Sequence, residues 1–388
     1  MSVRIFGSPP RYHQGPGAVL GIGGIARALA ETACVIVDEG VHGIVAGPIA
    51  ESLREAGVAG RVTPFAGEIT YAAIESLTAA LRADAPGLVV AAGGGKALDV
   101  GKGVAARLGV PIITVPTIAS NDAPTSASYA VYDEHHVMVA VDRMTRNPDA
   151  VVVDTALIAR APAHFLRAGI GDAVTKAFEA RGCLAGTGLT PFGTRPLLTG
   201  GVIAEAGYRT LRAHAAAALA AVERNAVTEA LEATVEACIL MSGLGFENGG
   251  LSLAHAMTRG LVKARGAMGA PHGEQVAYAV LVQLAVEGCA DDEILDLMGF
   301  LREVGLPVRL ADLGLTDAAP EEIDAVARLT MTAPHIPNMP CPVTAENIAA
   351  GMRRVEDLAA SGRSRPDEAA DASARSAPAF APAPGGTA

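Results

Sequence analysis

Short runs of β-branched residues alternate with Ala- and Leu-rich segments of helical period between about residue 17 and residue 155, and this alternation constrains the fold most. The runs are ACVIVDEG, GIVAG, GLVVAAGGG, VPIITVP and AVVVDT. Strands alternating with helices predict a parallel sheet that is covered by helices on both faces. Such sheets bind ligands at the carboxyl ends of their strands, so the loops after these runs are where we expect the chemistry.

The β-branched runs end after about residue 163, and long segments rich in Ala, Leu and Glu follow, such as NAVTEALEATVEACILMSGLGF. We therefore predict an α/β domain over residues 1–162 and an all-helical domain over residues 163–360. Residues 361–388 are rich in Ala, Pro, Ser and Gly and lack apolar periodicity, so we expect a disordered tail there.

Composition and charge exclude several classes of protein. Half of the residues are apolar, which indicates a globular chain, and 41 acidic against 30 basic side chains give a formal charge of −11, which disfavours nucleic acid and anionic membrane surfaces as partners. The longest apolar stretch, HAAAALAAV, is too short to span a membrane, and the first residues lack the pattern of a secretion signal. Five cysteines without CxxC spacing fit reduced thiols. We expect a cytoplasmic protein.

Three consecutive glycines, Gly93, Gly94 and Gly95, lie between the apolar run LVVAA and the helical pattern KALDVGKGVAARLG. Glycines allow the main chain to approach a ligand closely, and the N–H groups at a helix start favour an anion such as pyrophosphate. The spacing is not GxGxxG, and a glycine-rich turn also occurs wherever a strand turns sharply into a helix. The residues alone leave both interpretations open.

Asp38 ends the run ACVIVD in the same half of the expected sheet. A carboxylate there can accept hydrogen bonds from both ribose hydroxyls of an adenosine and repels a 2′-phosphate, which predicts NAD rather than NADP. The alternative is an ordinary turn aspartate. A polar loop after VPIITVP is typical of a groove that lines a cofactor and a polyhydroxy substrate. Its polar residues are Thr117, Ser120, Asn121, Asp122, Thr125, Ser126, Ser128 and Tyr132.

Asp172, His255 and His272 form a second set of candidates. Carboxylate oxygen and imidazole nitrogen suit a divalent metal of the zinc type, with a position left for substrate. His255 lies in an apolar helical pattern that directs its ring inward, and His272 lies at a helix start. As alternatives, Asp172 is an N-cap that pairs with Lys176, and His255 is a structural core histidine. The separations of 83 and 17 residues match no short metal motif.

Taken together, several long motifs resemble those of the glycerol dehydrogenases, in the iron-containing alcohol dehydrogenase superfamily. The motifs are GGGKALDVGK, VPTIASNDAPTSASYAVY, AGIGDAVTKAFEA, GFENGGLSLAHAMTRGL, PHGEQVAYAVLVQL and PNMPCPVT. The similarity is collinear from about residue 3 to residue 360. It implies a Rossmann-like NAD domain followed by a helical domain, as in the dehydroquinate synthase-like fold, with the active site in the cleft between them.

The resemblance also implies a role for each candidate residue. Asp172, His255 and His272 correspond to the metal ligands, Asp122 to a contact with the substrate polyol, and Asp38 to the contact with the adenosine ribose. The implied contacts on the pyrophosphate and nicotinamide side are Gly94, Gly95, Lys96, Ala97, Leu98, Asp99, Thr117 and Ser120. Ser126, Ser128 and Tyr132 would complete the cofactor groove.

The implied activity is NAD-dependent oxidation of glycerol, or of a related small vicinal diol, to dihydroxyacetone, with one zinc ion per subunit as Lewis acid and a homo-oligomeric enzyme. The iron-using members have a histidine four residues after the metal aspartate, where this chain has Lys176, so the three-ligand zinc form matches better. The alternative is an NAD(P)-dependent hydroxycarboxylate dehydrogenase (2-oxo acid reductase), because the cation of Lys176 favours an acidic substrate. Asp122 argues against this alternative, because it would repel the carboxylate of such a substrate. A dehydroquinate synthase-like cyclase is a third alternative, and the scarcity of Lys and Arg in the motifs argues against it.

Overall fold

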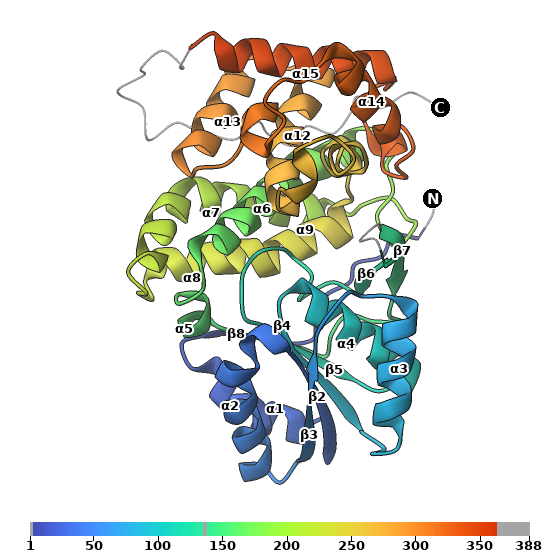
Figure 1. The fold of residues 1–388 in the computed structure, drawn as a ribbon, viewed down its shortest axis with the longest axis vertical. Coiled ribbons are helices and arrows are strands. Elements are labelled where there is room, and N and C mark those ends of the chain that lie inside the picture. The colour runs from blue at the N-terminus through green and yellow to red at the C-terminus, as the bar shows by residue number, and fades with distance from the viewer. Residues whose placement is uncertain (1–2, 135–137, 363–388) are drawn as a thin grey trace. The chain divides into compact units, whose positions relative to one another are not determined.

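The computed structural model describes residues 3–134 and 138–362 (Figure 1). The chain forms two compact units. The sheet unit contains residues 7–173 and 209–244, and the helical unit contains the described residues of 1–6, 174–208 and 245–388. Three of the borders fall inside helices, namely α6 (Ala163–Ala185), α7 (Leu198–Val222) and α9 (Ser242–Gly249). The single domain border expected at residue 162 stays a prediction, and the expected disordered tail lies outside the described residues from residue 363 onward.

A six-stranded parallel sheet is the centre of the sheet unit, which confirms the predicted fold class. Because all strands run the same way, their carboxyl ends lie along one edge, where the chemistry is expected. In spatial order the strands are β1 (Tyr12–Gly15), β8 (Ala150–Asp154), β5 (Ile112–Pro116), β4 (Leu88–Gly93), β2 (Thr32–Asp38) and β3 (Ala59–Phe65).

Strand β2 shows how the sheet separates two cores. Val35 belongs to a buried cluster that includes residues of α1 and α2, whereas its neighbour Ile36 belongs to a second cluster that includes residues of α3 and α4. Side chains alternate between the faces of a strand, so a strand covered on both sides reads as a continuous apolar run. The four helices are α1 (Ile22–Arg27), α2 (His42–Glu55), α3 (Tyr71–Arg82) and α4 (Gly95–Leu108).

The prediction of a strand for the run GIVAG is wrong, because residues 43–47 lie in α2. Val45, Ile49 and Leu53 recur every four residues and are all buried, so packing of this helical face outweighs the local strand preference of Val and Ile. The strand of this region is β3 instead. It lies at the edge of the sheet with Arg61 and Pro64 exposed, so it lacks the apolar pattern that marks a buried strand.

Two further strands lie outside the predicted set, and the first of them falls within the expected polar loop. β6 (Ser128–Tyr132) and β7 (Met138–Arg143) pair as an antiparallel hairpin outside the main sheet. β6 contributes Tyr129 and Val131 to the buried cluster that includes α4. The polar loop after β5 therefore ends in a hairpin that packs on α4, the helix that follows the glycine loop.

The remaining helices include the short α5 (Thr155–Ile158), α8 (Glu229–Glu236) and a π-helical turn (Ala237–Met241) in the sheet unit. In the helical unit, α12 is buried along most of its length and contacts α10, α11, α13 and α15. Among the described residues, no helix is long and apolar enough to cross a membrane. The other helices are α9 (Ser242–Gly249), α10 (Leu253–Ala256), α11 (Thr258–Leu261), α12 (His272–Val286), α13 (Asp291–Glu303), α14 (Pro320–Thr330) and α15 (Ala345–Ala360).

Candidate active site

The glycine loop joins β4 to α4 at the carboxyl edge of the sheet. Gly93 has a φ of +148°, and a Cβ there would lie 2.5 Å from Cβ of Asp38 and 2.8 Å from Cβ of Ala97. Only glycine fits this close approach of the turn to Asp38 and to the first turn of α4. The next loop is tied to the same place, because Thr117 N–H donates to the carbonyl of Gly93 at 3.0 Å.

Helix α4 begins at Gly95, one residue before the expected helical pattern, and no side chain caps its first turn. The unpaired N–H groups and the dipole of a helix start favour an anion. A Cβ at Gly95 would lie 2.9 Å from Nδ2 of Asn121, so the second loop closes over this helix start. The backbone geometry is compatible with the predicted phosphate site. It is equally compatible with the alternative, in which the glycines are needed only for the tight turn from strand to helix.

Asp38 makes the contact of an ordinary turn aspartate, which was the alternative to a ribose contact. Its Oδ1 accepts a hydrogen bond from the N–H of Gly40 at 2.9 Å and caps the short 3-10 turn that follows β2. The same residue lies against Gly93 at the sheet edge. Its predicted contact with an adenosine ribose is compatible with this position and stays a prediction.

Asp99 forms a buried charge network with Lys102, a residue that the sequence analysis missed. Lys102 Nζ lies 3.2 Å from Oδ1 of Asp99 and donates to the carbonyls of Ala123 at 2.5 Å and Ser128 at 2.7 Å. Oδ2 of Asp99 accepts from the N–H of Ala130 at 3.0 Å. Burial raises the pKa of Asp99, and Lys102 opposes that rise. These contacts fasten the hairpin to α4, and a nucleotide contact for Asp99 stays a prediction.

Other predicted groove residues also have protein partners. Ser126 Oγ donates to the carbonyl of Ser128 at 3.3 Å, and Ser128 Oγ accepts from Arg143 at 3.4 Å. Burial raises the pKa of Tyr132, the last residue of β6. The exposed Lys96 pairs with Glu68 at 2.9 Å. The structure thus gives these side chains structural contacts, and their predicted roles toward the nucleotide stay untested.

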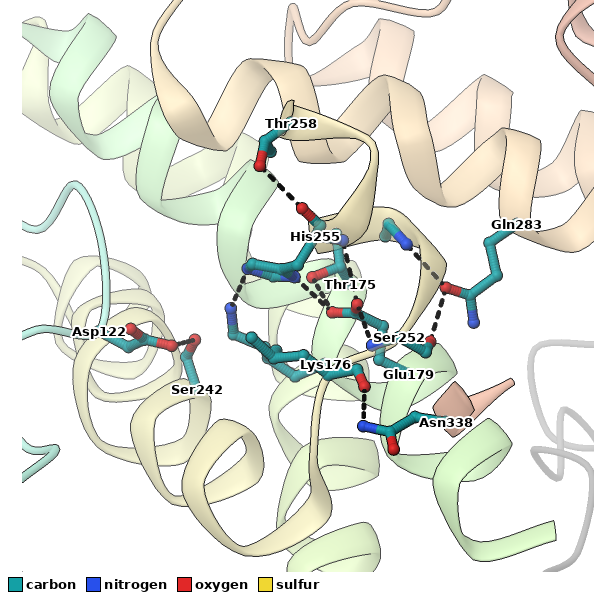
Figure 2. A network of polar contacts seen from close by, with 12 residues as sticks. Asp122, Thr175, Lys176, Glu179, Ser242, Ser252, His255, Thr258, Gln283 and Asn338 are labelled. Carbon is teal, nitrogen blue, oxygen red and sulfur yellow. Dashed lines mark hydrogen bonds and ion pairs between the residues drawn. The ribbon is translucent and has the colours of Figure 1, made fainter. Parts of the chain in front are cut away.

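Asp122 and Ser120 lie on the loop that closes over the start of α4. Oδ2 of Asp122 accepts a hydrogen bond from Ser242 Oγ at 3.3 Å (Figure 2). Ser120 Oγ lies 3.5 Å from Nδ2 of Asn121. Asp122 is partly exposed, and its predicted contact with the substrate polyol stays a prediction.

The structure brings Asp172, His255 and His272 together. One ligand atom of each residue lies within 4.8 Å of the others, and the two imidazole centroids are 5.3 Å apart. Asp172 is 1% exposed and lies in the middle of α6, so the N-cap alternative is wrong. His255 lies on α10, and His272 is the first residue of α12, as expected for a ring at a helix start. One carboxylate and two imidazoles are a suitable donor set for zinc or iron.

Glu179 is the second residue that the sequence analysis missed. Its Oε2 lies 2.6 Å from Nδ1 of His255, and its side chain is fully buried (Figure 2). Burial alone would raise the pKa of Glu179, but His255, Lys176 and the N–H of Ser252 outweigh burial and lower that pKa to about 2. A carboxylate only accepts, so Nδ1 of His255 carries the hydrogen and Nε2 presents its lone pair.

Lys176 lies one helical turn after Asp172 on α6 and is 2% exposed. Its Nζ is 3.1 Å from Nε2 of His255. An ammonium only donates, so Nε2 accepts a hydrogen bond from a positive charge. Nε2 of His255 has a single lone pair, which Lys176 occupies here, so Lys176 has to move away before that atom can bind a metal.

A signal for Glu179 was present in the motif DAVTKAFEA. Glu179 follows Asp172 by seven residues, or two helical turns, so both lie on one face of α6. The spacing alone does not separate such a residue from a solvated helix glutamate, which is the more frequent case.

A parallel sheet with an uncapped helix start at its carboxyl edge, together with helices that carry an Asp-His-His group, fits a metal-dependent dehydrogenase. The comparisons with known proteins agree. The family model described as iron-containing alcohol dehydrogenase matches residues 9–155. The chain is 41% identical to the glycolaldehyde reductase of Halobacterium salinarum, over 83% of this chain and 88% of that protein. It is 38% identical to the glycerol dehydrogenase of Pseudomonas putida, over 92% and 98%.

The fold comparison gives the same result. A crystal structure of a probable glycerol dehydrogenase from Sinorhizobium meliloti 1021 matches with a TM-score of 0.87 at 36% identity, and the match covers 93% of this chain and 100% of that one. The chain belongs to the iron-containing alcohol dehydrogenase family. The resemblance seen in the motifs is thereby confirmed.

Proposed function

We propose that this protein oxidises glycerol, or a related small vicinal diol, with NAD as the hydride acceptor and one zinc ion per subunit. The observation that carries the proposal is the convergence of Asp172, His255 and His272 within 4.8 Å. Relatives named glycerol dehydrogenase, with 36–38% identity over most of the chain, support this substrate class. The net reaction converts glycerol and NAD⁺ to dihydroxyacetone, NADH and a proton.

Asp172, His255 and His272 would hold the metal. A zinc ion in such a site acts as a Lewis acid that makes a bound alcohol more acidic. Glu179 orients the ring of His255 and keeps the hydrogen on Nδ1. The oxygen and nitrogen donors agree with zinc, and zinc rather than iron is part of the proposal.

The glycine loop and the start of α4 would hold the pyrophosphate of NAD. Their fit rests on Gly93, where any Cβ would collide with Asp38 and Ala97, and on the uncapped first turn of α4. Asp38 would accept from the adenosine ribose, which favours NAD over NADP. Asp122 would accept a hydrogen bond from a substrate hydroxyl.

A hydroxycarboxylate dehydrogenase is the second candidate, and one observation favours it. The buried ammonium of Lys176 lies beside His255, and a buried cation attracts an anionic substrate. Asp122 has the opposite effect, because a carboxylate on that loop would repel a carboxylate of the substrate. A substrate panel separates the two candidates directly.

The proposal includes a cytoplasmic location and a homo-oligomer. NAD-dependent chemistry supports the location, as do the five cysteines, which are all free thiols in the described part of the chain. Size-exclusion chromatography with light scattering measures the assembly. A monomer at micromolar concentration would contradict that part of the proposal.

The decisive experiment follows absorbance at 340 nm with zinc-loaded and chelated protein. Glycerol, 1,2-propanediol and 2-hydroxybutyrate are offered with NAD⁺, and dihydroxyacetone and glycolaldehyde with NADH. We expect the diols to react only with the loaded protein, and His272→Ala to lose metal binding and turnover while NAD binding persists. His164→Ala, at an exposed histidine of α6, is the matched control. Full activity of metal-free His272→Ala would refute the proposal.

A further inference from the structure

We propose that Glu179 is a positioning residue that fixes His255 for metal binding, an inference that rests on the ligand set of the proposed function. The first observation is the short contact of 2.6 Å between Oε2 of Glu179 and Nδ1 of His255. A carboxylate bonded to one ring nitrogen sets the tautomer and makes the other nitrogen a stronger ligand. Glu179 is itself no candidate ligand, because its oxygens accept from Nδ1 of His255, from the Thr175 hydroxyl and from backbone N–H groups.

The second oxygen of Glu179 holds the backbone that carries the same histidine. Oε1 accepts from the N–H of Ser252 at 2.7 Å and from the N–H of His255 at 3.1 Å. Helix α10 has only four residues, and its N-cap Ser252 makes no side-chain cap. Glu179, on the neighbouring helix α6, supplies that cap instead. One carboxylate therefore fixes both the ring and the main chain of His255.

The first turn of this short helix is also held by Gln283 of α12. Oε1 of Gln283 accepts from Ser252 Oγ at 2.9 Å and from the N–H of Ala254 at 3.1 Å (Figure 2). Because α10 is held from two helices, the position of His255 is set before any ion binds. Gln283 reaches the Ser252 hydroxyl and the N–H of Ala254 but makes no hydrogen bond to the imidazole, and its amide donates to Glu287 at 2.8 Å. Glu179 does contact the imidazole, so the effect on the ligand ring belongs to Glu179.

Cobalt(II) titration followed by visible absorption tests this role, because it reports the metal site without any substrate. Glu179→Gln keeps the size and an acceptor oxygen but removes the charge, and Glu179→Ala removes both. Loss of an outer carboxylate typically costs 10- to 100-fold in metal affinity, so we expect about 10-fold for Gln and about 100-fold for Ala. Zinc competition with a chelating dye should give the same order.

A purely structural role predicts a different pattern, in which the metal-free variants lose stability and their cobalt affinity stays unchanged. Circular dichroism and thermal unfolding of metal-free protein therefore accompany each titration. Glu356→Gln is the matched control, because Glu356 is also a helix carboxylate that accepts from a backbone N–H, that of Leu310 at 2.9 Å. We expect this control to bind cobalt with wild-type affinity.

Wild-type cobalt affinity in folded Glu179→Gln would overturn the inference and leave the proposed function standing. Cobalt binding by the wild-type protein without oxidation of any diol would overturn the function and leave the inference standing. If Glu179→Ala fails to fold, the Gln variant decides, because it preserves the volume of the buried side chain.

Discussion

Replacing Lys102 by Met tests whether the buried charge network of the sheet unit holds the hairpin to α4. The ammonium of Lys102 is fully buried and contacts three oxygens, those of Asp99, Ala123 and Ser128, at 2.5–3.2 Å. Met has nearly the same length and no charge. The variant therefore removes the cation without opening a large cavity.

The expected cost follows from what the substitution leaves behind. Three hydrogen bonds to a charged group are worth about 1.5–3 kcal/mol each before the desolvation of the ammonium is counted. Removing one partner of a buried pair costs about 3–5 kcal/mol overall, because the other charge remains buried. Asp99 keeps the N–H of Ala130, and its pKa, which burial already raises, rises further. We expect a loss of about 4 kcal/mol in the free energy of unfolding at pH 7.

Denaturant unfolding of the metal-free protein measures this loss. Arg61→Met is the control, because Arg61 pairs with Asp84 at 2.9 Å on the surface, where such pairs contribute about 0–1 kcal/mol. The double variant Asp99→Asn, Lys102→Met should recover part of the loss, since no buried charge is left uncompensated. A loss below about 1 kcal/mol for Lys102→Met alone would show that our assignment of the network as the anchor of the hairpin is wrong.

Three further outcomes are expected. Gly93→Ala should abolish NAD binding measured by calorimetry, because its Cβ would lie 2.5 Å from Cβ of Asp38; unchanged affinity would contradict the tight turn. Burial lowers the pKa of His335 to about 4. The unfolded chain then binds the proton first, so metal-free protein loses about 3 kcal/mol of stability as the pH falls from 6.5 to 4. His335→Gln should flatten that pH dependence in denaturant titrations, and an unchanged slope would refute it. Ellman's reagent at pH 8 should modify Cys289 and Cys341 before the three buried cysteines, and equal rates would contradict the burial.

Much of the sheet could be predicted from the sequence, because strands buried on both faces read as unbroken apolar runs. The strands β2, β4, β5 and β8 and the start of α4 lie where the pattern placed them. The two edge strands were missed for a physical reason. β1 has only four residues and β3 is largely exposed, so neither carries the pattern of a buried strand. The run GIVAG has the residues of a buried strand but forms part of α2, because the packing of its helical face outweighs the strand propensity of Val and Ile.

The candidate site depended on information that local pattern does not contain. Asp172 and His255 are 83 residues apart, which matches no short metal motif, so their chemistry made a shared metal one of several interpretations and the resemblance of whole motifs favoured it. Glu179 and Lys102 could not be predicted in this way. A charged residue in a helix is normally solvated, and nothing in its neighbours indicates that it lies in the interior with several partners. Burial of charge is set by the tertiary structure.

The exposed edge strand β3 has a consequence for how copies of this chain associate. An open edge presents backbone groups on which another chain can add a strand and aggregate. Pro64 offers no N–H to such a strand, and the charge of Arg61 would have to be desolvated beside it. Intermolecular β-sheet growth is therefore disfavoured at this edge of the sheet.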